Sequence, residues 1–236
     1  MIDVYAVNFF EPPSHDVVDS LLKVIDSDKK ARIERFVRSD DAIRSLLADV
    51  LVRFIVCLKL RWKNSEVKFS TAVQGKPYLL NCDDFHFNVS HSGSWVACAC
   101  DAQPVGIDIE LIQPIDYSIA EYCFSPKEYR ALMQEPESRR LWHFYNIWTL
   151  KESYVKALGV GVGLNLQLNS FSFEFKGEQI DFEYSGQGDT SCYFKQYLID
   201  PSYTLSVAAA HNNFAASVVV MSVRELRLAA DALLRV

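Results

Sequence analysis

The sequence predicts an α+β fold, in which helices and antiparallel strands follow one another in irregular order. Two patterns carry this prediction. Apolar residues recur at three- and four-residue spacing from about Asp40 to Leu60, which indicates a long helix. Residues 171–175 and 180–184 alternate strictly between apolar and polar side chains around Lys176-Gly177-Glu178-Gln179, which is typical of a β-hairpin. A doubly wound parallel sheet is therefore not expected.

The remaining elements are expected in chain order. In the N-terminal half we expect a strand over 3–9, a helix over 40–60 with its N-terminal cap at 39–41, and strands over 85–89 and 95–100 joined by a turn at 90–93. In the C-terminal half we expect a strand over 105–111, a helix-rich stretch over 119–158, the hairpin, a strand pair over 191–198 and 203–210, and a helix over 224–234. Gln103-Pro104 is the best candidate joint, which divides the chain into an N-terminal lobe, 1–103, and a C-terminal lobe, 104–236.

Composition excludes several classes of protein. Half of the 236 residues are hydrophobic, which excludes a largely disordered chain. The net charge of −6 argues against a general nucleic-acid binder. We see no targeting segment and no apolar run long enough to span a bilayer. Six cysteines without a C-x-x-C pair are expected to be free thiols, so the expected location is cytoplasmic.

A first candidate site lies on the strand Gly106-Ile107-Asp108-Ile109-Glu110. Side chains alternate along a strand, so Asp108 and Glu110 share one face, roughly 7 Å apart at the backbone, while the isoleucines face the core. Neighbouring carboxylates repel unless a cation lies between them, and hard oxygen ligands suit Mg²⁺. A strand with a solvated acidic face is the alternative.

A second candidate site lies on the helix that runs from Trp148 to Gly159. Glu152 and Lys156 lie four residues apart and therefore share a helix face. One is suited to be a metal ligand or general base, and the other a phosphate ligand or acid. The alternative is a surface ion pair. The glycines that follow do not lie between a strand and a helix, which excludes a dinucleotide-binding loop.

A third candidate is the segment Phe87–Gly93, which is expected to place Ser90, His91 and Ser92 on a tight turn where backbone N–H groups can bind an anion. A turn histidine satisfied by the backbone is the alternative. A catalytic triad is disfavoured because adjacent Ser90 and His91 cannot easily hydrogen bond. A cluster of cations suited to a phosphate, or to a solvated face, comprises Lys29, Lys30, Arg32, Arg35, Arg38 and Arg44.

In order along the chain, these segments resemble the Sfp-type 4′-phosphopantetheinyl transferases. The family pattern is G-x-D-x-E, followed about forty residues later by W-[ST]-x-K-E-[AS]-x-x-K, and residues 106–110 and 148–156 match it at every defining position. The upstream blocks Gly75-Lys76-Pro77, Phe87–Ser92, and Arg35-Phe36 followed by Asp41–Arg44 also match. Each block is weak alone, whereas the ordered set is specific.

The resemblance implies two similar α+β lobes about a pseudo-twofold axis, each with an antiparallel sheet and helices, and an active site between them. It implies a monomer that transfers the 4′-phosphopantetheine arm of coenzyme A to a serine of acyl or peptidyl carrier proteins of peptide or polyketide synthases. The reaction would release 3′,5′-ADP. Non-polar side chains over 115–124 are then candidates for the carrier docking surface.

The resemblance also implies a role for each site residue. Asp108, Glu110 and Glu152 would hold Mg²⁺, and Lys156 would contact the pyrophosphate and assist the leaving group. Glu152, directly or through a metal-bound water, would be the base. The remaining coenzyme A contacts would come from Lys29, Arg32, Arg44 and His91 at the 3′-phosphate, Lys76 at the adenine and Ser90 at the phosphates. Two alternatives stay open, a metal-dependent phosphohydrolase acting on coenzyme A or a nucleotide, and a carrier-protein-binding module without catalysis.

Overall fold

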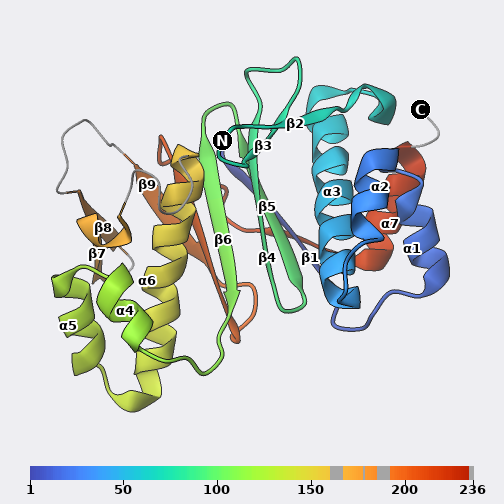
Figure 1. Cartoon of the computed structure of the whole chain (residues 1–236). Coiled ribbons are helices and arrows are strands. Elements are labelled where there is room, and N and C mark those ends of the chain that lie inside the picture. The colour runs from blue at the N-terminus through green and yellow to red at the C-terminus, as the bar shows by residue number, and fades with distance from the viewer. Residues whose placement is uncertain (160–166, 178, 185–191, 234–236) are drawn as a thin grey trace.

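Two β-sheets lie face to face in the middle of the molecule, and helices cover the outer face of each (Figure 1). This computed structural model describes residues 1–159, 167–177, 179–184 and 192–233. Helices and mostly antiparallel strands alternate irregularly along the chain, so the predicted α+β class is confirmed.

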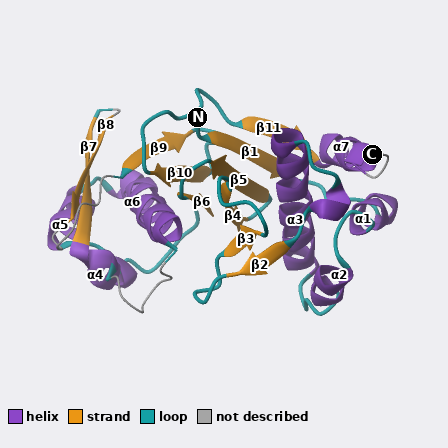
Figure 2. Cartoon of the chain, turned by 90° about the horizontal axis from the view of Figure 1, so that it is seen from above, coloured by secondary structure: helices purple, strands orange, loops and turns teal. Residues whose placement is uncertain are grey.

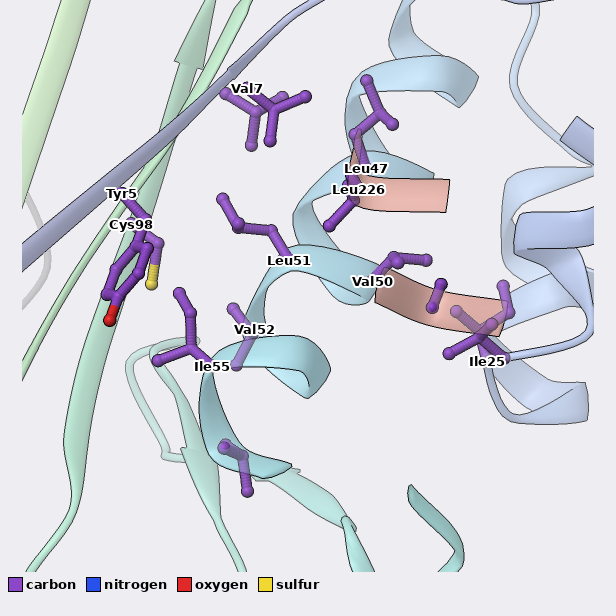
Figure 3. Close-up of a cluster of buried hydrophobic side chains, with 14 of the residues drawn as sticks. Tyr5, Val7, Ile25, Leu47, Val50, Leu51, Val52, Ile55, Cys98 and Leu226 are labelled. Atoms are coloured by element: carbon purple, nitrogen blue, oxygen red, sulfur yellow. The ribbon is translucent and has the colours of Figure 1, made fainter. Parts of the chain in front are cut away.

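The first sheet has the strand order β11-β1-β5-β4. Antiparallel pairing joins β1 (Asp3–Asn8), β5 (Trp95–Asp101) and β4 (His86–Ser92), whereas β11 (Val219–Ser222) is parallel to β1. Its outer face is covered by α3 (Ser39–Leu60), α1 (His15–Leu22) and α7 (Val223–Leu233). Figure 3 shows the contact, in which Leu51 and Ile55 of α3 face Tyr5 and Cys98 of the sheet.

The second sheet has the order β6-β10-β9, all antiparallel, with β6 (Val105–Leu111), β10 (Tyr203–Ala209) and β9 (Tyr193–Tyr197). Helix α6 (Glu137–Leu158) lies on its outer face. Beyond α6 lie α4 (Ser118–Cys123), α5 (Pro126–Gln134) and the hairpin of β7 (Phe171–Lys176) and β8 (Gln179–Tyr184). Each half therefore pairs three antiparallel strands with one 22-residue helix, which is the expected likeness between the lobes.

Smaller elements connect these layers. Helix α2 (Ser27–Ile33) precedes α3, and a short ladder of β2 (Phe69–Thr71) and β3 (Pro77–Leu79) precedes β4. Single 3₁₀ turns span Asn64–Glu66 and Leu168–Ser170. In Figure 2 the β2–β3 hairpin lies beside β4, on the side of α2 and α3.

The contact between the sheets depends on the alternation along β6. Ile107 and Ile109 are fully buried and pack with Val4, Ala97 and Val207 between the two sheets, as predicted. The opposite face of β6 lies against α6. A Cβ added at Gly106 would be 2.0 Å from the carbonyl oxygen of Ser153, so only glycine lets the helix lie this close to the strand.

One expectation about β4 is wrong. Ser90, His91 and Ser92 belong to the strand and pair with Ala97, Val96 and Trp95, so the turn is confined to Gly93 and Ser94. Their backbone pairs with β5, so they do not form the tight turn that was expected to bind an anion. The polar sequence of this segment suggested a turn, but hydrogen bonding to the well-buried β5 extends the strand.

The chain returns to its first sheet at the end, because β11 pairs with β1 and α7 packs against α3 and α1. The division at residues 103 and 104 stays a prediction, and in space β11 and α7 belong with the N-terminal sheet. Residues 178, 191 and 234, expected in the hairpin turn, a strand and the last helix, lie outside the described residues, as do Gly161 and Gly163. None of the described helices is long and apolar enough to cross a membrane.

Candidate active site

Asp108 lies at the centre of the site, on the face of β6 that meets α6. Its side chain is almost fully buried, and its Oδ1 atom accepts hydrogen bonds from Lys156 Nζ at 2.6 Å and from Ser90 Oγ at 2.9 Å. The other oxygen, Oδ2, is also buried but has no hydrogen-bond partner among the described residues. A buried carboxylate oxygen without a partner is costly, which marks it as a position for a ligand.

Side chains of β4 connect that strand to β6. Asn88 Oδ1 accepts from the backbone N–H of Ile107 at 2.9 Å. Ser92 Oγ donates to Glu110 Oε2 at 2.8 Å and accepts from the N–H of Leu111 at 3.1 Å. Ser92 was predicted only as part of the expected anion-binding turn, and Asn88 was given no role of its own. Alternation along the strand places both on the face of Ser90, so a correct strand assignment would have found them.

Lys156 crosses from α6 to β6 instead of pairing with Glu152. Its salt bridge is with Asp108, which excludes the surface ion pair with Glu152 as the reason for this spacing. Burial raises the pKa of Glu152, the charge of Asp108 raises it further, and Lys156 opposes the shift. Lys156 therefore contacts the acidic strand, and Glu152 lies close enough for the charge of Asp108 to act on it.

The site holds more negative charge than Lys156 can balance. Burial, followed by the charge of Asp108, raises the pKa of Glu110 to about 7. Burial likewise raises the pKa of Asp108, although Lys156 and Ser90 oppose it. Three carboxylates and an unpartnered Oδ2 are a donor set that fits a hard divalent cation. Within the described parts of the chain, no three His, Cys, Asp or Glu side chains already form a metal cluster.

Two residues predicted to bind the 3′-phosphate lie near this centre. Arg44 donates to the carbonyl oxygen of Gly93 at 2.6 Å and pairs with Asp41. His91 projects from the face of β4 opposite Ser90. Partial desolvation lowers the pKa of His91, and the charges of Arg44 and then Lys156 lower it further. His91 therefore lies close enough to Arg44 and Lys156 for their charges to act on its imidazole.

Lys29 and Arg32 line a cavity of about 590 Å³ between α2, α3, β2 and β4. Burial lowers the pKa of Lys29, and the charge of Arg32 adds to this effect. Val89 also lines the cavity and shares a strand face with His91, so Arg44 and His91 lie farther along the same face. The predicted 3′-phosphate residues are therefore arranged in two pairs along one face of β4.

Lys76 does not line this cavity. Its ammonium donates to the carbonyl oxygens of Lys156 at 2.6 Å, Val105 at 3.0 Å and Ala157 at 3.4 Å. Pro77, the next residue, does line the cavity. The Gly75-Lys76-Pro77 block therefore faces the cavity through its hairpin, while the Lys76 side chain reaches the end of α6.

Lys151, the first lysine of the helix motif, makes buried contacts that connect elements of the fold. It is fully buried, donates to the carbonyl oxygens of Leu168 at 2.8 Å and Phe171 at 2.7 Å, and pairs with buried Glu128 at 2.9 Å. Glu128 also accepts from the N–H groups of Ser125 and Phe173. This pair joins α5, α6 and β7. The buried ion pair of Glu128 was missed because Lys151 lies far away in the sequence, although the spacing of Ser125 and Glu128 is that of a helix capping box.

The segment proposed for docking borders the acidic strand. A second cavity, of about 610 Å³, is lined by Glu110, by Ile115, Ile119 and Tyr122 from the predicted segment, and by Trp148 of α6. Tyr122 is 76% exposed. Exposed apolar side chains next to Glu110 are therefore present where the sequence predicted them.

Comparison with known proteins identifies the class. Residues 104–216 match the 4′-phosphopantetheinyl transferase superfamily, and residues 11–103 match "4′-phosphopantetheinyl transferase, N-terminal". The chain is 38% identical to 4′-phosphopantetheinyl transferase Sfp of Bacillus subtilis, over 94% of this chain and 99% of that one. It is also 38% identical to 4′-phosphopantetheinyl transferase gsp of Aneurinibacillus migulanus, over 67% of this chain and 66% of that one. The chain belongs to the 4′-phosphopantetheinyl transferase family, as its motifs predicted.

Proposed function

We propose that this chain transfers the 4′-phosphopantetheine arm of coenzyme A to a serine hydroxyl of acyl or peptidyl carrier proteins of peptide or polyketide synthases, and releases 3′,5′-ADP. The observation that carries the proposal is the meeting of Lys156 with the carboxylate of Asp108, beside Glu110 and Glu152. The names of the relatives, 4′-phosphopantetheinyl transferases, support the same reaction.

We further propose that Asp108, Glu110 and Glu152 hold Mg²⁺. The unpartnered Oδ2 atom of Asp108 and the mutual repulsion of the carboxylates favour such a cation. When bound, Mg²⁺ would neutralise charge on the pyrophosphate and on the leaving group. The salt bridge of Lys156 with Asp108 would then be exchanged for a contact of Lys156 with the pyrophosphate.

The chain's own residues would bind coenzyme A, stabilise the leaving group and deprotonate the carrier serine. Arg44, His91, Lys29 and Arg32 would bind the 3′-phosphate end of coenzyme A along one face of β4, and Ser90 would contact the phosphates. Lys156 would stabilise charge that develops on the departing 3′,5′-ADP. Glu152 would take the proton of the carrier serine, because burial raises its pKa and makes it a stronger base than an exposed glutamate.

The partners and location follow as parts of the same proposal. The second cavity and exposed Tyr122 would receive the carrier protein, and no nucleic acid or membrane is required. Two similar halves in one chain supply both walls of the site, which supports a monomer. All six cysteines are free thiols, which supports a cytoplasmic location.

Mass spectrometry of an apo carrier protein, incubated with this protein, coenzyme A and Mg²⁺, tests the proposal. Transfer adds the phosphopantetheine arm to the carrier. Consumption of coenzyme A without a change in the carrier mass would identify a phosphohydrolase instead. Carrier binding without either reaction would identify a binding module.

A further inference from the structure

The Lys76 side chain joins the two halves of the molecule at the end of the catalytic helix. Its hairpin belongs to the N-terminal half, whereas all three carbonyl oxygens that accept from its ammonium belong to β6 and α6. The closest of them, at 2.6 Å, is the carbonyl of Lys156 itself. The contact therefore holds the backbone of the residue whose own ammonium reaches Asp108.

The last carbonyl oxygens of a helix have no partner within the helix. Helix α6 ends at Leu158, and the next residue, Gly159, has the left-handed conformation at φ 68° and donates its N–H to the carbonyl of Val155. Lys76 supplies donors for the next two carbonyls, those of Lys156 and Ala157. A cation there also complements the negative end of the helix dipole.

Burying the Lys76 ammonium at the end of α6 removes water from the charged group, which is unfavourable. Burial lowers the pKa of Lys76 to about 8, so the protein favours the charged form less than water does. An exposed lysine at this turn would avoid that cost. The same hairpin forms a wall of the Lys29 and Arg32 cavity through Pro77, so the cavity wall and the end of α6 are connected through two adjacent residues, Pro77 and Lys76.

We propose that Lys76 is a positioning residue that fixes the last turn of α6, and hence Lys156, relative to the Lys29 and Arg32 cavity. This inference rests on the proposed function. It assigns the Lys76 side chain to the end of α6 instead of to the adenine of coenzyme A. The hairpin contributes to the cavity through Pro77, and the ammonium contributes through the carbonyl of Lys156.

Hydrogen exchange of the α6 amides tests the positioning role of Lys76 without a measurement of enzyme activity. We expect Lys76→Met to exchange at least fivefold faster than the wild type over residues 155–159, and Lys76→Arg, which keeps cationic donors, to recover most of the protection. Lys23→Met, at an exposed lysine after α1, is the matched control and should exchange like the wild type. Unchanged exchange in Lys76→Met would overturn the proposal. If Lys76→Met does not fold, Lys76→Gln takes its place.

Kinetics separate positioning from direct binding. A positioning role predicts that Lys76→Met lowers kcat about tenfold and changes the Kd for coenzyme A less than threefold. A direct adenine ligand predicts the reverse, a weaker Kd at unchanged kcat, and that result would also overturn the proposal. If the wild type transfers nothing, the proposed function fails, while hydrogen exchange still decides whether Lys76 clamps the helix.

Discussion

Lys156 Nζ lies 2.6 Å from Asp108 Oδ1, and the other oxygen of that carboxylate is buried without a hydrogen-bond partner among the described residues. The Oδ1 atom of Asp108 is thus paired, and the Oδ2 atom is available for a ligand. The carboxylate can accept a cation at Oδ2 without first losing Ser90. This arrangement makes Asp108 the most sensitive position of the site.

Replacing Asp108 by Asn should reduce transfer at least a hundredfold, because the substitution keeps the shape but removes the charge that holds Lys156 and the metal. The free energy of unfolding of the metal-free protein should stay within about 1 kcal/mol of the wild type, since less repulsion of Glu110 offsets the lost salt bridge. Carrier mass and urea unfolding measure the two effects. Near-normal turnover with Mg²⁺ would refute the metal assignment.

The stability of the metal-free protein should fall as pH rises from about 4.5 to about 7, because burial and Asp108 raise the folded pKa of Glu110 from 4.5 to about 7. Over that window the folded state binds more protons than the unfolded state, so the free energy of unfolding decreases. We expect about 2 kcal/mol, after a discount for partial exposure. Glu110→Gln should lack this component when unfolding is measured across pH in a chelator, and an identical pH profile would contradict the assignment.

Arg44→Ala and His91→Ala should weaken the binding of coenzyme A more than that of 3′-dephospho-coenzyme A. The loss of one charge-assisted phosphate contact should cost about 2 kcal/mol with the intact donor. Isothermal titration with both compounds measures the difference. Equal losses for the two donors would show that neither residue contacts the 3′-phosphate.

Glu152→Gln and Lys156→Ala should differ in their response to Mg²⁺. If Glu152 is both ligand and base, its substitution should slow the chemical step and shift the Mg²⁺ dependence. Lys156→Ala should lower turnover and change the Mg²⁺ dependence less than Glu152→Gln does, because Lys156 is not one of the proposed metal ligands and is replaced at Asp108 when the metal binds. Single-turnover rates across Mg²⁺ concentrations decide this, and wild-type rates in both variants would exclude a catalytic role for this helix.

Lys151→Met should destabilise the protein by about 3–5 kcal/mol, because it leaves Glu128 buried without its ion partner. Lys127→Met is the control, since Lys127 pairs with Glu174 at the surface and its loss should cost less than about 1 kcal/mol. Thermal and urea unfolding of both variants measure the difference. Equal effects would contradict a special role for the buried pair.

Local patterns were sufficient for the elements with clear periodicity. Alternation placed Asp108 and Glu110 on one face of a strand, and helical spacing placed Glu152 and Lys156 together, because both relations depend only on neighbouring residues. The Ser90–Ser92 segment was assigned to a turn because its strand depends on pairing with β5. Helices α1 and α2 and strand β11 were not predicted, since short elements gain most of their stability from tertiary contacts.

Side-chain contacts between residues far apart in the chain could not be predicted from the sequence. The destination of Lys76 is set by where α6 ends, eighty residues later. The partner of Lys151 is set by how α5 packs, and the partner of Lys156 by how closely Gly106 lets α6 approach β6. Each of these depends on the assembled layers and not on local spacing.

The pairing of β11 with β1 also has a consequence for how the protein is made. During synthesis from the N-terminus, β5 can pair with one edge of β1 once residue 101 has emerged, but the other edge has no partner until residues 219–222 follow. Helix α7, which closes over α3, arrives later still. The strands of the second sheet all lie between these two events in chain order. The sheet whose strands are made first is therefore the last to have all of its strands, and one edge of β1 stays open to other chains until residues 219–222 have been made.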